Sequence, residues 1–177
     1  MGYTHYFNLK KKPTQKKWDS FTKECQVLLK NLPSFSESAG GCYINEHINI
    51  FGVSGGGKPE INSNLVCFNG DGSKGLDHET FVIEKAILSD FCKTARKPYD
   101  LLAVACLIAA NRNLGLLFSS DGYIDYEGVK ECSDLIPAMK YYNEQIKPVN
   151  AITGDPDPVT EDELWLIRKK YKKYRLF

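Results

Sequence analysis

The stretch Leu101-Leu102-Ala103-Val104-Ala105-Cys106-Leu107-Ile108-Ala109-Ala110 decides the fold of this chain. A helix that is apolar on every side belongs in the interior of a protein, and its alanines allow neighbouring elements to approach closely. Pro98 and Asp100 suit the first turn of such a helix, and Gly115 suits its end. We therefore expect a buried central helix over Tyr99–Asn113. Its apolar stretch is about half of the roughly 20 residues that cross a bilayer, so no membrane span is expected.

Strand signals precede the central helix. Aromatic and polar residues alternate over Tyr3–Asn8, which predicts a strand with one buried face. Leu65–Asn69 and Phe81–Ile83 are expected to pair as an antiparallel hairpin. Cys42–Phe51 predicts one bent strand or a tight hairpin, and Lys85–Lys97 fits either a strand or a helix.

A first helix is expected between the opening strand and the hairpin. Thr14 suits its N-cap, and a Leu-Pro step at Pro33 stops it after about Asn31. Apolar residues recur along it at helical spacing, which predicts one buried face. These residues are Trp18, Phe21, Cys25 and Leu28.

Three further elements are expected after the central helix. Leu116–Phe118 predicts a short strand, and Ser119–Gly122 has the composition of a turn. Tyr126–Ile146 predicts a helix with a break or kink at Pro137, because proline lacks the N–H that a helix interior needs.

The composition changes in the last part of the chain. Lys147–Pro158 contains three prolines, which predicts a stiff linker. Thr160 and Glu163 then form the capping box of an amphipathic helix. The sequence thus predicts an α+β core domain over residues 1–146, with a mainly antiparallel sheet packed against the buried central helix. Residues 147–177 form the linker and the C-terminal helix, whose apolar face docks on its own core or joins a second copy.

Charge and cysteine usage exclude several classes of protein. The chain has 177 residues, with 23 Lys and Arg against 22 Asp and Glu, so its formal net charge is +1. This balance gives no global field that would attract nucleic acid or a membrane surface. The six cysteines form no Cys-x-x-Cys pair, which argues against a zinc ribbon or a thioredoxin motif. We expect them to be reduced and buried, as is typical of the cytosol.

Two loops resemble ligand-binding motifs without matching them. Gly52–Lys58 fits the start of a phosphate loop, but Pro59 replaces the Ser or Thr that holds magnesium. Asp71–Glu79 concentrates oxygen and imidazole ligands, yet its spacing differs from that of an EF-hand loop. No metal and no cofactor are therefore expected. A zinc site would require three scattered histidines to meet: His5, His47 and His78.

The strongest candidate site is a basic segment that immediately precedes the central helix. Lys93, Arg96 and Lys97 are expected to converge on an anion, with the Thr94 hydroxyl and the first amides of the helix beside them. The guanidinium of Arg96 has the planar fork that suits phosphate or carboxylate, and an aromatic ring from the opening strand would stack a base. The alternative is a solvated, salt-bridged loop. The other candidate ligand-binding residues are Tyr3, His5, Tyr6 and His78.

Cys92, beside the basic segment, is the candidate nucleophile for a catalytic alternative, with His5 or His78 as its base. The sequence has no Gly-x-Ser-x-Gly elbow and no His-Glu-x-x-His motif. No catalytic residue is therefore assigned, and a binding protein is favoured over an enzyme.

Several segments resemble a family of small proteins of tailed bacteriophages. They are Met-Gly-Tyr-Thr-His-Tyr-Phe at the start, Phe-Asn-Gly-Asp-Gly with His-Glu-Thr-Phe in the middle, Phe-Cys-Lys-Thr-Ala-Arg-Lys-Pro-Tyr-Asp at 91–100, and Ser-Ser-Asp-Gly at 119–122. The resemblance covers residues 2–122. It implies expression in the cytoplasm of an infected bacterium, and it implies no particular reaction.

Small phage proteins without enzyme signatures often disarm host defence. We therefore expect a non-catalytic protein that binds a phosphorylated, nucleotide-derived small molecule and sequesters a host immune signal. Two alternatives stay open: a protein-blocking inhibitor of a host defence enzyme, and a hydrolase of a nucleotide signal. The expected partner is an anionic small molecule, with a host protein or a second copy bound through the C-terminal helix as alternatives. Neither nucleic acid nor a membrane is expected.

Overall fold

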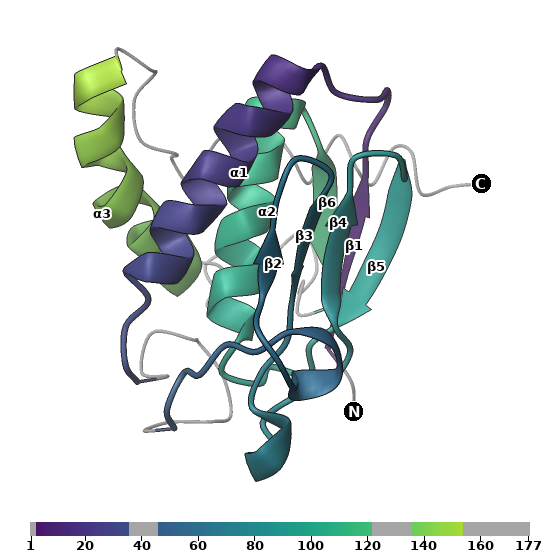
Figure 1. Ribbon diagram of the computed structural model, residues 1–177, viewed down its shortest axis with the longest axis vertical. Helices are drawn as coiled ribbons and strands as arrows, with labels where there is room; N and C mark the ends of the chain where they lie inside the picture. Colours follow the sequence, from purple (N-terminus) through teal and green to yellow (C-terminus); the bar gives the residue numbers. More distant parts are fainter. Residues whose placement is uncertain (1–2, 36–45, 122–135, 154–177) are drawn as a thin grey trace, which may run out of the picture.

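The computed structural model describes residues 3–35, 46–121 and 136–153 (Figure 1). In Figure 1 the helices lie on one side of the strands, which confirms an α+β fold with antiparallel strands. In chain order the elements are β1 (Thr4–Asn8), α1 (Gln15–Lys30), the short 3₁₀ turn η2 (Val53–Gly55), β2 (Glu60–Ile61), β3 (Leu65–Phe68), the 3₁₀ turn η3 (Gly72–Lys74), β4 (Phe81–Glu84), β5 (Ser89–Lys93), α2 (Asp100–Leu114), β6 (Leu117–Ser120) and α3 (Ile136–Thr153).

The described strands form two small antiparallel sheets, with the orders β5-β1-β6 and β2-β3-β4. β3 and β4 pair in the hairpin that the sequence predicts. In the other sheet β1 is central: Thr4 lies opposite Lys93 of β5, and His5 lies opposite both Cys92 of β5 and Ser120 of β6. The start of β1 therefore meets the ends of β5 and β6 at one end of the molecule.

Helix α2 is the centre of the core, as the sequence predicts. Every residue of Leu101–Ala110 is buried. The helix ends at Gly115, whose φ of 72° is a left-handed conformation that glycine adopts without strain. The predicted face of α1 is buried, and α1 begins at Thr14, whose hydroxyl accepts a hydrogen bond from the amide of Lys17. Both α1 and α3 pack against α2.

Two local expectations are wrong. Ser119 and Ser120 belong to β6 and do not form a turn, because both pair with β1 and this pairing overrides the turn-like composition. Over residues 46–51 there is no strand but only isolated bridges, from His47 to Phe35 and from Phe51 to Asn69. The rest of the predicted Cys42–Phe51 strand lies outside the described residues.

Helix α3, which the structure describes from Ile136, extends beyond the C-terminal end of the predicted Tyr126–Ile146 helix. Pro137 is the second residue of α3 as described, where the missing N–H breaks no hydrogen bond within that helix. The predicted start, residues 126–135, lies outside the described residues. At its other end α3 continues to Thr153, across the predicted boundary at residues 146 and 147. Residues 154–177, with the predicted C-terminal helix, lie outside the described part of the chain.

The described cysteines behave as small buried hydrophobic residues. They are free and buried, as expected, while Cys42 and Cys132 lie outside the described ranges. None of the helices in the described ranges combines the length and the apolar character that a bilayer crossing requires. The four described cysteines are Cys25, Cys67, Cys92 and Cys106.

Candidate functional site

A buried polar network lies where β1, β6 and the start of α2 meet. The His5 ring is completely buried, with Nε2 2.7 Å from Asp100 Oδ1 and Nδ1 2.7 Å from Ser120 Oγ. Asp100 is 1% exposed and Ser120 is 9% exposed. Thr94 is also fully buried, and its hydroxyl donates to the same oxygen of Asp100.

The hydrogen-bond partners of the network restrict the roles of the two His5 nitrogens. Asp100 lies in the first turn of α2, where the helix dipole favours a carboxylate. A carboxylate only accepts hydrogen bonds, so Nε2 of His5 carries the proton that it shares with Asp100. Nδ1 of His5 faces the Ser120 hydroxyl, a group that can both donate and accept a hydrogen bond. The network thus ties β1, β6 and the segment before α2 to one another.

The segment between β5 and α2 has an unusual backbone. Ala95 and Arg96 both have positive φ, at 51° and 56°. Such a left-handed conformation costs about 1–2 kcal/mol for a residue other than glycine, and it persists only where surrounding contacts impose it. Here the Ala95 amide donates to the carbonyl of Tyr3 at 3.1 Å, and the Lys97 amide donates to the carbonyl of Thr94 at 3.0 Å. The strained pair therefore lies between two anchored points.

The left-handed turn places Arg96 over the ring of Tyr3, the residue just before β1. Its guanidinium carbon lies 4.5 Å from the centre of the Tyr3 ring, within the range of a cation–π contact. The Tyr3 ring is 5% exposed and also packs edge-on against His5, with ring centres 5.1 Å apart. Arg96 itself is half-buried. The polar network and the cation are therefore linked through Tyr3.

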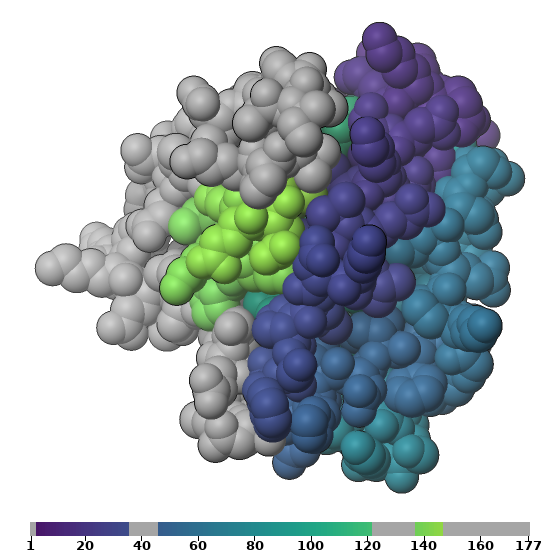
Figure 2. All heavy atoms as spheres, turned by 60° about the vertical axis from the view of Figure 1, so that its left-hand side comes forward, coloured from purple at the N-terminus to yellow at the C-terminus, as the bar shows by residue number. Residues whose placement is uncertain are grey.

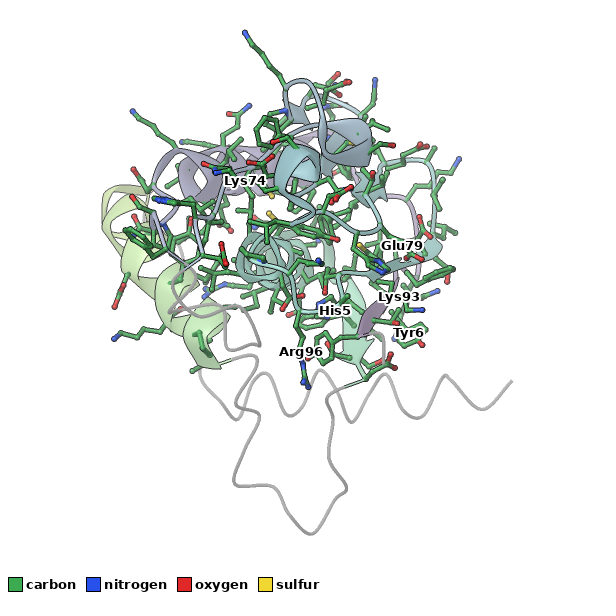
Figure 3. The ribbon with its side chains drawn as sticks, turned by 90° about the horizontal axis from the view of Figure 1, so that it is seen from below. His5, Tyr6, Lys74, Glu79, Lys93 and Arg96 are labelled. Carbon is green, nitrogen blue, oxygen red and sulfur yellow. The ribbon has the colours of Figure 1, made fainter. Side chains whose placement is uncertain are left out.

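The basic side chains do not converge as expected. The Lys97 ammonium donates to the carbonyl of Gly75 at 2.6 Å. Figure 3 shows Arg96 and Lys93 extending in different directions, with Lys93 on the same side as Tyr6. The physical reason is the left-handed pair at residues 95 and 96, which turns the chain between these side chains.

The remaining predicted site residues lie around the end of β5. His78 is exposed, and its Nδ1 donates to the carbonyl of Lys93 at 2.7 Å. The Lys93 amide donates to Glu79 Oε2 at 2.7 Å. Tyr6 is half-buried, and its ring centre lies 6.4 Å from that of Phe91. Among the predicted residues, His5 and Thr94 thus have their polar atoms engaged inside the protein, whereas Lys93, Arg96, Tyr6 and His78 reach the surface.

Cys92 does not fit the role of nucleophile. Its side chain is 1% exposed, and its thiol lies 3.5 Å from the carbonyl oxygen of Glu79. Burial raises the pKa of this thiol far above its ordinary value, and the nearby carboxylates of Glu79 and Asp100 raise it further. The reactive thiolate is therefore absent at neutral pH.

The two motif-like loops pack against each other. A Cβ on Gly55 would lie 2.7 Å from the Cα of Gly72, so the Gly-rich loop is closed on the neighbouring turn. Asp71 accepts hydrogen bonds from the Ser73 amide and hydroxyl, at 3.1 and 2.6 Å, and these bonds lower its pKa. Strand β2 follows the Gly-rich loop where a phosphate loop needs a helix. Within residues 3–35, 46–121 and 136–153 no three His, Cys, Asp or Glu side chains group as metal ligands do.

Sequence reasoning missed Asp100, Ser120 and Phe91 as residues of this site. Asp100 reads as an ordinary helix-start residue, and Ser120 as part of a turn. Only strand pairing brings His5 next to Ser120, so no local signal identifies that contact. Phe91 lies on β5 and is 56% exposed. From the sequence alone, an exposed aromatic residue in a strand looks the same as a buried one.

Comparison of the chain with protein-family models, with curated proteins and with solved structures finds no match.

Proposed function

We propose that this chain binds a phosphorylated, nucleotide-derived small molecule without reacting with it, and that it sequesters a host immune signal during phage infection. The observation that carries the proposal is the position of Arg96, whose guanidinium lies 4.5 Å over the Tyr3 ring on a left-handed backbone. The resemblance to tailed-phage proteins supports the setting, the cytoplasm of the infected bacterium.

The chemistry of a stacked guanidinium suits phosphate. When the face of a guanidinium lies on a tyrosine ring, its N–H groups point outward from the edge in a planar fork that matches two phosphate oxygens. The strain at Ala95 and Arg96 supports a functional role, because such strain is concentrated where a side chain must be aimed. His5, Thr94, Asp100 and Ser120 act here as positioning residues that hold the loop in place.

An aromatic surface beside Lys93 supports the nucleotide part of the proposal. Phe91 and Tyr6 lie next to each other on paired strands, and Phe91 is 56% exposed. A base would stack on these rings, and base–aromatic stacking contributes about 1–3 kcal/mol. Lys93 lies on the same side as Tyr6 and adds a positive charge there, while Arg96 extends in a different direction, so the ligand would contact the two cations with separate parts (Figure 3).

The test is equilibrium binding of a panel of mononucleotides and cyclic dinucleotides to wild type, Arg96→Ala and Arg96→Lys. We expect Arg96→Ala to weaken the complex by at least about 1.5 kcal/mol, and Arg96→Lys to restore only part of this loss. Lys30→Ala, which removes an exposed charge at the far end of α1, is the matched control. Heat denaturation of the complex should release intact ligand. Unchanged affinity in a folded Arg96→Ala protein would refute the role of Arg96.

A specific observation favours a hydrolase as the second candidate. Ser120, His5 and Asp100 are joined in series by two contacts of 2.7 Å, the arrangement in which an imidazole activates a hydroxyl. As Ser120 Oγ bonds to phosphorus, its proton passes to Nδ1 of His5, which then protonates the leaving oxygen. Water then cleaves the covalent intermediate by the reverse proton transfers. Binding remains the leading proposal because His5 is fully buried and Ser120 is only 9% exposed.

The same panel separates the two candidates. A hydrolase releases a product of changed mass after incubation, and Ser120→Ala abolishes that product. A binding protein releases unchanged nucleotide, and Ser120→Ala affects only its stability.

A further inference from the structure

A groove of about 610 Å³ lies at the end of the strands opposite the Arg96 site. Three connections form it: the one between β1 and α1, the β2–β3 turn and the β4–β5 turn. Figure 1 shows all three together at the top of the molecule, whereas the N-terminal end of β1 lies at the bottom. Figure 2 shows the start of α1, in purple, beside the blue ends of the strands.

The groove lies at a local concentration of positive charge. Lys12 and Lys85 line it, on the β1–α1 connection and on the β4–β5 turn. The eight-residue segment 10–17 contains five lysines and no acidic residue, in a chain whose net charge is only +1. All five are exposed, and the first turn of α1 contains no acidic residue. Glu84 is the acidic side chain that lines the groove. The exposed lysines are Lys10, Lys11, Lys12, Lys16 and Lys17.

The lysines at the start of α1 lower the stability of this helix. Lys16 and Lys17 lie in the first turn, next to the positive end of the helix dipole, where acidic residues are favourable. A bound anion would relieve both the repulsion among the lysines and their unfavourable position on the helix. The arrangement therefore favours a negatively charged ligand over an empty solvated surface.

The rim of the groove is held by internal hydrogen bonds. Asn62 Oδ1 accepts from the amides of Asn64 and Leu65, both at 3.0 Å. The Asn62 carbonyl accepts from the indole of the buried Trp18 at 3.0 Å, and the Lys85 amide donates to the Asn64 carbonyl at 2.9 Å. The Lys85 ammonium also donates to the Gln15 side chain, which joins the β4–β5 turn to α1. Such a preformed rim lowers the entropic cost of binding.

We infer that this groove binds a small molecule with two or more phosphate groups, at a site separate from Arg96 and independent of the proposed function. Its volume is in the range of about 300–1,000 Å³ that small-molecule sites have. Pro13 and Leu65 provide an apolar wall, and Lys12 and Lys85 provide charge from two different connections. Among the described residues that line the groove there is no aromatic ring, so phosphate contacts and not base stacking account for affinity.

The test measures binding of inorganic tripolyphosphate and inorganic phosphate by isothermal titration calorimetry. Wild type should bind tripolyphosphate more tightly than phosphate, and added salt should weaken this binding because the lysines are exposed. The double variant Lys12→Ala/Lys85→Gln should lose at least about tenfold in affinity. Glu84→Gln should tighten binding about threefold, because it removes the negative charge that faces the ligand. A purely structural role of Glu84 would not produce a gain.

Two controls make the result specific. Lys30→Ala removes the same kind of charge at the far end of α1 and should change the affinity by less than about twofold. In the Arg96→Ala background, where the phosphate site of the proposed function is removed, tripolyphosphate should still bind and the Lys12→Ala/Lys85→Gln change should still cost about tenfold, which separates this groove from the proposed function. Circular dichroism melts verify that each variant is folded. No binding of tripolyphosphate by wild type, an equal loss in Lys30→Ala, or an intact affinity in the double variant would each overturn the inference.

Discussion

Nε2 of His5 lies 2.7 Å from Oδ1 of Asp100, and both side chains are excluded from solvent, with exposed fractions of 0% and 1%. These residues come from the first strand and from the start of the central helix, far apart in the sequence. The contact joins β1 to the start of α2, next to the loop that contains Arg96. Because Thr94 donates to the same carboxylate oxygen, Asp100 is the centre of this junction.

The first prediction concerns Asp100. Asp100→Ala leaves the Thr94 hydroxyl and the His5 N–H without their acceptor, which should lower the free energy of unfolding by roughly 3 kcal/mol. Asp100→Asn retains the oxygen that accepts both bonds and loses only the charge, so it should cost about 1–2 kcal/mol. Urea denaturation measures both values. Equal losses in the two variants would contradict the shared-oxygen geometry.

A second prediction tests the left-handed backbone at the same loop. Ala95→Gly removes strain of about 1–2 kcal/mol and adds disorder to the unfolded chain, so stability should stay equal or rise by up to about 1 kcal/mol. Gly115→Ala is the converse case. Gly115 has φ of 72° and no atom within 4 Å of an added Cβ, so that variant should lose about 1 kcal/mol from conformation alone. Thermal unfolding of the pair decides the matter, and a clear loss in Ala95→Gly would count against the strain.

The third prediction follows from the pKa of Cys92. Burial raises this pKa, so the thiol should stay protonated and unmodified by iodoacetamide in the folded protein at pH 8. Unfolding removes the desolvation and returns the pKa to its ordinary value, so urea should make Cys92 reactive. Peptide mapping by mass spectrometry reads this residue separately from Cys42 and Cys132. Rapid alkylation of Cys92 before unfolding would show that the β5 side chain reaches solvent.

A fourth prediction addresses how α3 docks. The Tyr141 hydroxyl donates to the carbonyl of Leu28 near the end of α1, and the Tyr142 hydroxyl donates to Glu24 Oε2 at 2.7 Å. Tyr141→Phe and Tyr142→Phe should each lower the free energy of unfolding by about 1 kcal/mol. Since the two bonds are separate, the double variant should show nearly additive losses. If neither variant changes the denaturation midpoint, α3 does not pack on α1 in this way.

Much of the architecture is predictable from sequence because its signals are local. The continuous apolar stretch at residues 101–110 predicts the buried helix, and the spacing of Trp18, Phe21, Cys25 and Leu28 predicts the buried face of α1. Gly115 marks the end of α2 because glycine adopts the left-handed conformation there without strain. Each of these features depends on neighbours within one or two turns, which is why sequence alone suffices.

The candidate site depends on contacts that no local pattern contains. The basic segment at 93–97 suggests converging cations, but the left-handed pair at residues 95 and 96 and the Lys97 bond to Gly75 direct them apart. The same holds for Ser120, which sequence assigns to a turn and strand pairing places against His5. At a junction between helices and strands, the direction of a side chain depends on which elements meet there.

Sequence by itself thus determined the class of fold, the core helix and the glycine that ends it, because hydrophobic periodicity and glycine geometry act over short distances. Tertiary structure alone decided that His5, Thr94, Asp100 and Ser120 share one buried network, and that Arg96 lies on Tyr3. It also decided that Lys12 and Lys85 face one groove. The reason is that the contacts at these positions come from segments distant in the chain, and that the buried polar atoms of the His5 network need hydrogen-bond partners which those segments supply.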